Sequence, residues 1–185
     1  HAMGVEGEGS ARPMPGRELS LAGSLNEAEL DSTLLSADNP ALPGDQSFVI
    51  AGIREGNRLP TVPELQMAAS ATYGARLGAN ADWYITGSVQ HVDSRYTQPA
   101  DQEPGAGLFT AINFFGPPQS FDVDLKLPSY ELVNLSAGVE FDNGLDVILY
   151  ANNVFDESPK LSFDRERGGR ARLGFNVGQP RTIDL

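Results

Sequence analysis

The chain has 185 residues, a formal net charge of -12 and no cysteine. A strongly acidic chain cannot neutralise phosphates, so the charge argues against nucleic acid as a partner. The absence of cysteine excludes disulfides, thiol nucleophiles and thiolate metal sites. No stretch approaches the roughly 18 consecutive apolar residues of a membrane-spanning helix.

Residues 1–16 carry no periodic pattern. His1-Ala2-Met3-Gly4 resembles the remnant of an expression tag, and the residues up to Gly16 are rich in Gly, Glu, Pro and Ser. Such a composition cannot bury enough apolar surface to order a segment. We therefore expect a tag remnant and a disordered linker over residues 1–16, and one β-rich domain over residues 17–185.

Alternation of apolar and polar residues predicts the first strands. It covers Arg17–Asn26, Glu64–Leu77 and Trp83–Tyr96. Glu64–Leu77 also contains the helix formers Ala, Leu, Gln and Met, which leaves a helix as the alternative there. Its strict period of two favours a strand. Between these runs, Ser47–Ile53 is a short segment that would pair locally within a long connection.

A hairpin over 131–152 shows the alternation most clearly. Its strands, Glu131–Phe141 and Leu145–Asn152, flank the turn Asp142-Asn143-Gly144, whose Asn and Gly tolerate positive φ. One face carries the apolar residues Val133, Leu135, Ala137, Val139, Phe141, Leu145, Val147, Leu149 and Ala151. Beyond the hairpin, Pro180–Leu185 begins a further strand.

The connections between these strands are alternately long and short. Residues 27–60, 97–128 and 157–178 form long ones, whereas 78–82 and 142–144 form short turns. Long connections are unusual in compact soluble domains, but transmembrane barrels have short turns on one side and long loops on the other. We predict an all-β antiparallel up-and-down meander, a partial transmembrane β-barrel of about five full strands plus the start of a sixth, with long outer loops. A soluble β-sandwich or small-barrel binding module is the alternative, because its strands alternate equally.

Few residues offer catalytic or metal-binding chemistry. His91, the histidine outside the first residues, has no partner at the spacing of a catalytic triad or metal site. Asp31, Asp38 and Asp45 lack the spacing of a calcium loop. We therefore predict no catalytic residue, no metal, no cofactor and no enzymatic activity. The candidates for ligand contact are Asn113, Phe114 and Phe115 in a long loop, with packing of the loop on itself as the competing interpretation.

Three motifs carry a family resemblance. Gly56-Asn57-Arg58-Leu59-Pro60-Thr61-Val62-Pro63 precedes one alternating run, Asn152-Asn153-Val154-Phe155-Asp156 closes the hairpin, and Gly178-Gln179-Pro180-Arg181-Thr182 opens the last strand. In this order they resemble the C-terminal barrel segment of TonB-dependent outer-membrane receptors. Val154 stands where that family usually has Leu, and the chain lacks the terminal aromatic residue usual there.

The resemblance implies a fragment of a nutrient importer in the outer membrane of a Gram-negative bacterium. Siderophores, cobalamin or glycans would be the ligands, and TonB would act through an N-terminal region outside this chain, which would not transport alone. Asn134, Ser136, Glu140, Asp146 and Asn152 would line the lumen, and the long loops would form the outer ligand mouth. Outer-membrane lipid would contact the apolar faces, and an isolated fragment would self-associate.

Aromatic residues near the strand ends fit the same interpretation. Trp83, Tyr73, Tyr130 and Phe155 would form girdles where lipid meets water, because an amphipathic ring is stable at that boundary. Packing over an ordinary core is the alternative for each of them.

Overall fold

A computed structural model describes residues 1–37, 44, 47–110, 120–165 and 173–185. Its main feature is one antiparallel sheet of seven strands in the order β1-β2-β3-β4-β9-β10-β13. The strands are β1 (Ala2–Ala11), β2 (Arg17–Ala28), β3 (Leu65–Leu77), β4 (Ala81–Val92), β9 (Tyr130–Phe141), β10 (Asp146–Asn152) and β13 (Thr182–Asp184). Each strand of this sheet lies beside the strand of the sheet that comes next in the sequence, so the predicted up-and-down meander is confirmed. Within the described residues, no helix has the length and apolar character needed to cross a membrane.

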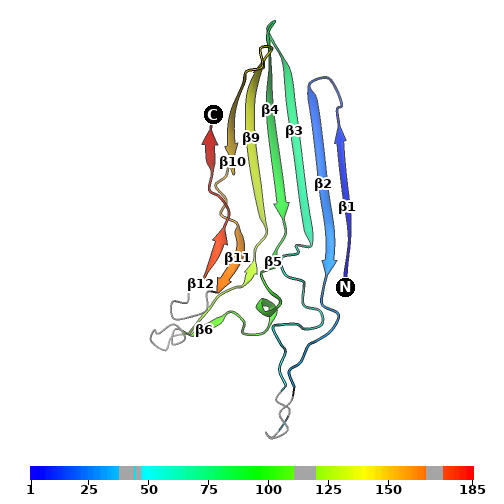
Figure 1. The fold of residues 1–185 in the computed structure, drawn as a ribbon, viewed down its shortest axis with the longest axis vertical. Helices are drawn as coiled ribbons and strands as arrows, with labels where there is room; N and C mark the ends of the chain where they lie inside the picture. The colour runs from blue at the N-terminus through cyan, green and yellow to red at the C-terminus, as the bar shows by residue number, and fades with distance from the viewer. Residues whose placement is uncertain (38–43, 45–46, 111–119, 166–172) are drawn as a thin grey trace.

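The long connections all leave the same end of the sheet (Figure 1). We name 29–64, 93–129 and 153–181 the first, second and third long connections; the short turns 12–16, 78–80 and 142–145 lie at the opposite end. Small elements form within the second and third connections: β5 (Arg95–Tyr96), η1 (Pro99–Gln102), β6 (Leu108–Thr110), β7 (Ser120–Asp122), β8 (Lys126–Leu127), β11 (Lys160–Arg165) and β12 (Leu173–Val177). The predicted alternation of long and short connections is therefore confirmed.

Strand β1 corrects the prediction for the N-terminus. It pairs with β2 along its whole length, from Ala2 opposite Ala28 to Ala11 opposite Leu19. The polar residues Glu6, Glu8 and Ser10 stand at every second position. The positions between them are Gly7 and Gly9 instead of apolar residues, so the sequence lacks the apolar–polar alternation that predicts a strand. The prediction of a disordered linker is wrong for residues 2–11, because the open edge of β2 supplies hydrogen-bond partners that composition alone does not reveal.

The other predicted strands are confirmed, with differences of one or two residues at several ends and one larger change. The strand predicted to end at Tyr96 leaves the main sheet after Val92, and Arg95–Tyr96 pairs instead with β8. At the break, the Asp93 carboxylate accepts a hydrogen bond from the Ser94 N–H at 2.6 Å, so that amide is unavailable to a strand ladder. The predicted local pairing of Ser47–Ile53 is also confirmed, since Leu35 and Val49 form a bridge.

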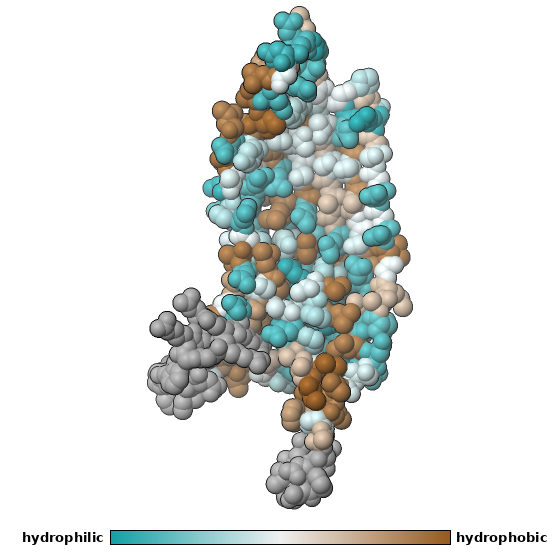
Figure 2. All heavy atoms as spheres, viewed as in Figure 1, coloured by the Kyte–Doolittle hydropathy of each residue, from teal (hydrophilic) through white to brown (hydrophobic). Residues whose placement is uncertain are grey.

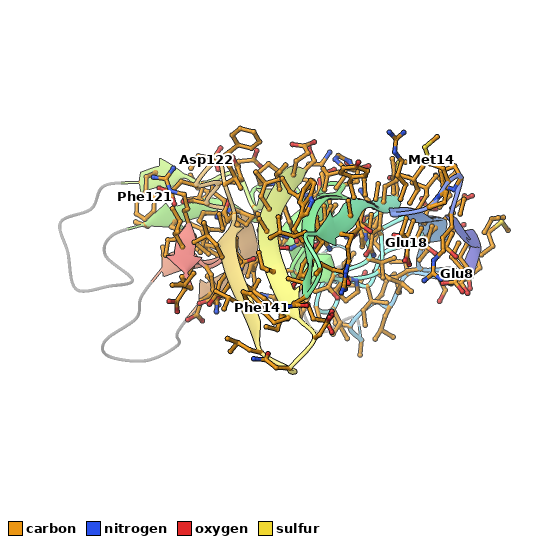
Figure 3. The ribbon with its side chains drawn as sticks, turned by 90° about the horizontal axis from the view of Figure 1, so that it is seen from above. Glu8, Met14, Glu18, Phe121, Asp122 and Phe141 are labelled. Carbon is orange, nitrogen blue, oxygen red and sulfur yellow. The ribbon has the colours of Figure 1, made fainter. Side chains whose placement is uncertain are left out.

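The register gives the sheet two faces of opposite character. Asp82, Glu140 and Asp146 lie opposite one another across β4, β9 and β10, and so do Ile85, Ala137 and Leu149. Residues directly opposite each other share a face, so the even-numbered positions of these strands form a polar face and the odd-numbered positions an apolar face. Viewed along the strands, the sheet is a single layer with side chains projecting from both faces (Figure 3).

Burial is concentrated away from the middle of this sheet. The buried apolar residues among those described are Ala81, Val92, Leu125, Leu127 and Phe163. Ala81 and Val92 are the ends of β4, and the others belong to the long connections. In the described part of the chain no second sheet covers the apolar face, whereas the alternative of a soluble β-sandwich requires one.

Candidate functional site

The apolar face is exposed over the length of the sheet. Leu135 is 45% exposed and Leu149 51% exposed, although both lie in the interior of strands. The exposed large side chains of this face are Met3, Val5, Leu19, Leu21, Leu25, Met67, Tyr73, Leu77, Ile85, Val89, Leu135, Phe141, Val147, Leu149 and Ile183. Exposure on this scale marks a surface that contacts something other than water.

Charged residues occupy both ends of the apolar face. Arg17 lies next to the short turn 12–16, and Glu27, His91 and Glu131 lie at the ends of strands that meet the long connections. The apolar part of β9, from Val133 to Phe141, is about nine residues long, which is the length of tilted strand that crosses the hydrocarbon of a bilayer. The face is thus a band of membrane thickness with polar borders.

Aromatic residues mark the border near the short turns. The Tyr73 and Trp83 rings meet edge to face with centroids 5.4 Å apart, and the Arg17 guanidinium lies 5.5 Å from the Tyr73 centroid. Phe155 lies at the start of the third long connection, toward the opposite end of the sheet, and is 75% exposed. Tyr130 differs from the girdle prediction, because its partner Val92 belongs to the polar face and the Arg95 guanidinium lies over its ring.

The polar face carries two open grooves of about 510 and 790 Å³ over β1–β4. Hydroxyl pairs cross the strands on this face, such as Ser20 with Ser70 at 2.7 Å and Thr72 with Thr86 at 2.9 Å. Hydrophilic residues are spread along the sheet in Figure 2. The predicted lumen residues Asn134, Ser136, Glu140, Asp146 and Asn152 all lie on the polar face.

An arginine ties two of the short turns together. Arg76 at the end of β3 donates to the Asp142 carboxylate at 3.0 and 2.7 Å and to Asp82 at 3.0 Å, while the Asp142 N–H donates to the Asn80 carbonyl. The hydrogen bonds from Arg76 lower the pKa of Asp142 below its usual value. This end of the sheet is thereby fixed by charge as well as by backbone pairing.

The structure joins the two family motifs that follow the hairpin. Asn153, with φ of 52°, donates through its side-chain amide to the carbonyls of Glu157 at 2.7 Å and Gln179 at 2.9 Å. The Asp156 carboxylate accepts the Arg181 N–H at 2.8 Å. These motifs are therefore a structural junction that starts the third long connection and returns it to the sheet at β13.

Aromatic rings connect the second and third long connections. Phe109 contacts Phe121 and Phe163, each at 5.9 Å between centroids, and Phe163 contacts Phe175 at 5.1 Å. Packing of the connections on themselves, the competing interpretation of their aromatics, accounts for these four. The ligand candidates Asn113, Phe114 and Phe115 lie outside the described residues and stay a prediction.

Histidine chemistry gives no site. The His91 ring nitrogen Nδ1 lies 2.8 Å from Glu131 at the border of the apolar face. His1, Glu27 and Glu29 place potential metal-binding atoms within 4.8 Å of one another, but the His1 ring and amino group already contact the Asp31 carboxylate. Exposed carboxylates beside a chain terminus are common without a metal, so we assign none here.

Comparisons with known proteins agree with this geometry. The family model for the β-barrel of TonB-dependent receptor-like proteins matches residues 1–154. The chain belongs to the TonB-dependent receptor family. These receptors are transporters rather than enzymes and lie in the outer membrane of Gram-negative bacteria. The match begins at residue 1 and includes the whole of strand β1, in agreement with the corrected N-terminus.

Solved structures of TonB-dependent receptors share the fold. The ferric yersiniabactin uptake receptor FyuA from Yersinia pestis matches with a TM-score of 0.64 and 18% identity, covering 98% of this chain and 22% of that receptor. The siderophore receptor PiuA from Acinetobacter baumannii matches with a TM-score of 0.60 and 18% identity, covering 98% of this chain and 20% of the receptor. No curated protein matches the chain. The chain thus spans about a fifth of the length of these receptors.

Sequence reasoning missed the residues that join the long connections. Arg54, Asn57 and Glu103 form one hydrogen-bonded group although more than forty residues separate Asn57 from Glu103. Asn57 belongs to a family motif, and that was the available signal. That Glu103 is its hydrogen-bond partner could be found only from the tertiary structure.

Proposed function

We propose that this chain is the C-terminal wall of a TonB-dependent importer, with its apolar face against lipid and its polar face toward the lumen. The observation that carries the proposal is the exposed apolar band, of bilayer thickness, bordered by Arg17 at one end and by His91 and Glu131 at the other. The long connections, which share one end, form part of the outer ligand mouth. TonB acts through a part of the receptor outside this chain.

Ferric siderophores are the ligand class that we favour. Both similar structures are described as uptake or siderophore receptors, although their 18% identity to this chain establishes the fold alone. Calorimetric titration of the full-length receptor with a panel of ferric siderophores, with cobalamin and an oligosaccharide as comparators, tests the class. Binding of cobalamin or the oligosaccharide in place of every siderophore would contradict it.

A fluorescence experiment tests the orientation of the two faces. Leu135 and Ser136 are neighbours near the middle of β9 but lie on opposite faces. This chain contributes no cysteine, so single cysteines at 135 and 136 can be labelled in liposomes once any cysteine elsewhere in the receptor is replaced. A quencher confined to lipid tails should quench the probe at 135 strongly and the probe at 136 weakly. Equal quenching at both positions would overturn the proposed orientation.

The same exposed surfaces predict how the chain behaves outside a membrane. Its open sheet has two unpaired edges, β1 and β13, in addition to the apolar band. Without detergent, the chain alone should therefore form large particles in light scattering. A monodisperse monomer in detergent-free buffer would contradict the assignment of the band to lipid.

A further inference from the structure

The first and second long connections are joined by a shared carboxylate. Glu103 accepts hydrogen bonds from Arg54 Nε at 2.9 Å and Arg54 Nη2 at 2.6 Å, in a bidentate ion pair. The Asn57 side chain donates to the same carboxylate at 2.9 Å. Arg54 and Asn57 belong to the first connection and Glu103 follows η1 in the second, so this group fixes their relative position.

Amide pairing extends the contact along η1. The Arg58 N–H donates to the Gln102 side-chain oxygen at 2.9 Å, and the Gln102 side-chain nitrogen donates to the Arg58 carbonyl at 2.9 Å. Gln102 thus satisfies the backbone of the first connection in the way a neighbouring strand would. The Thr61 N–H continues the pairing with the Tyr96 carbonyl at 2.8 Å.

A glycine allows the two backbones to approach closely. A Cβ atom at Gly52 would lie 2.3 Å from both Cα and N of Ala100 in η1, a distance that requires the backbones to separate. Gly56, in the same connection, has open space at the corresponding position. Both have positive φ, 70° for Gly52 and 83° for Gly56. The two glycines therefore differ in their contact with η1 but share the backbone conformation.

The second connection is joined in turn to the third. The Phe163 N–H in β11 donates to Thr97 Oγ1 at 2.7 Å, and Arg95 Nη2 donates to the Leu161 carbonyl at 3.3 Å. The Phe109 and Phe163 rings pack together, and Phe163 is 4% exposed. Thr97 lies directly before the segment Gln98–Gln102 that holds the first connection, so η1 and its flanks contact both neighbours.

We propose that η1 couples the three long connections into one unit, so that releasing the first connection from η1 also loosens β11 in the third. Between described residues, no hydrogen bond or ion pair joins the first connection directly to β11, whereas the segment 94–103 bonds to both. A ligand that holds any one connection in place would then also restrict the motion of the other two. That last consequence rests on the proposed function, whereas the coupling itself does not.

Hydrogen exchange in the full-length protein in detergent tests the coupling without any ligand. Gly52→Ala should accelerate exchange at 160–165, on the order of tenfold, because β11 opens more often once η1 is displaced. Gly56→Ala is the matched control, since it imposes an Ala at positive φ in the same connection but meets no atom of η1. Equal exchange of 160–165 in the two variants would overturn the proposal.

A double-mutant cycle identifies the route. Thr97→Val removes the acceptor for the Phe163 N–H and should by itself accelerate exchange at 160–165, while Thr97→Ser keeps the hydroxyl and should not. Adding Gly52→Ala to Thr97→Val should then accelerate exchange at 160–165 by less than Gly52→Ala does alone, because one of the contacts between η1 and β11 is already lost. Fully additive effects of the two substitutions would exclude the Thr97–Phe163 hydrogen bond as part of the route. Since no nutrient is present, failure of these tests is independent of whether the receptor imports siderophores.

Discussion

The sheet and the long connections differ in whether they bury any of their large apolar side chains within the chain. Leu149 in β10 is 51% exposed and Leu135 in β9 is 45% exposed, whereas Leu127 and Phe163 in the connections are 0% and 4% exposed. In a soluble protein the regular sheet would hold the core and the connections would be exposed. The sheet must therefore obtain its apolar partner from outside the chain, while the connections bury some apolar side chains against one another and leave others exposed, such as Phe48 at 66% and Leu108 at 59%.

Removing a buried side chain from the connections should have the largest effect. Leu127→Ala deletes a fully buried side chain, and such substitutions cost about 2–5 kcal/mol. Leu149→Ala on the apolar face should cost much less in detergent, because a mobile detergent chain fills the space. Hydrogen exchange at 126–127 and in β10 measures the local free energy of opening in each case. A larger loss of this free energy for Leu149→Ala than for Leu127→Ala would contradict the prediction.

Charge placed in the middle of the sheet should distinguish its two faces. Leu135→Lys puts an ammonium group on the apolar face, where a lysine near the bilayer midplane costs about 2–4 kcal/mol. Ser136→Lys, one residue away on the polar face, should cost little because water can reach it. Reversible unfolding of the receptor from lipid vesicles gives both values. Similar losses at 135 and 136 would mean that both faces have the same surroundings.

Alternation made most of the sheet predictable. The strands from Arg17 to Asn152, whose apolar residues recur at every second position, were found with small errors at their ends. Strand β1 was missed because Gly7 and Gly9 stand where apolar side chains would have revealed it. Such a strand forms because it pairs with a neighbouring strand, and a local sequence pattern does not show that pairing.

The connections were predictable in length but not in structure. Hairpins β6–β7 and β11–β12 have few residues, and their rings contact each other across 54 residues of sequence, as Phe109 and Phe163 do. The Glu103 contacts arise in the same way, from segments brought together by the sheet. Asn57 and Asn153 belong to the family motifs, although the sequence did not single them out within those motifs. Their hydrogen-bond partners required the fold.

A glycine on the polar face should be sensitive to an added side chain. A Cβ atom at Gly138 would lie 2.4 Å from the Tyr84 ring, which packs directly over this residue from β4. Gly138→Val should displace that ring and cost about 1–3 kcal/mol, the usual range for overpacking. Gly174→Val in β12 is the control, since a Cβ there meets no atom within 4 Å. Thermal unfolding in detergent compares the stability of the two variants. An equal loss of stability would show that the contact with the Tyr84 ring does not cause the effect of Gly138→Val.

The smallest expected effect is a pH dependence confined to the long connections. Hydrogen bonds from Arg54 lower the pKa of Glu103 below its usual value. A carboxylate with a lowered pKa adds stability above its ordinary pKa, about 4.3 for Glu, and that stability is lost as the pH falls below this value. The first connection should therefore stay attached to η1 at neutral pH and loosen in acid.

A spin label at position 55 can report this release. Glu55 lies next to Arg54, its side chain forms no ion pair within the described residues, and the chain has no cysteine to compete with Glu55→Cys. Nitroxide mobility should rise as the pH falls below about 4.3. In the Glu103→Gln variant the ion pair is absent at every pH, so the label should be more mobile at neutral pH and the acid step should disappear. An acid step that persists in Glu103→Gln would assign the release to another carboxylate and leave the Arg54–Glu103 pair without a measurable role in holding the connections together.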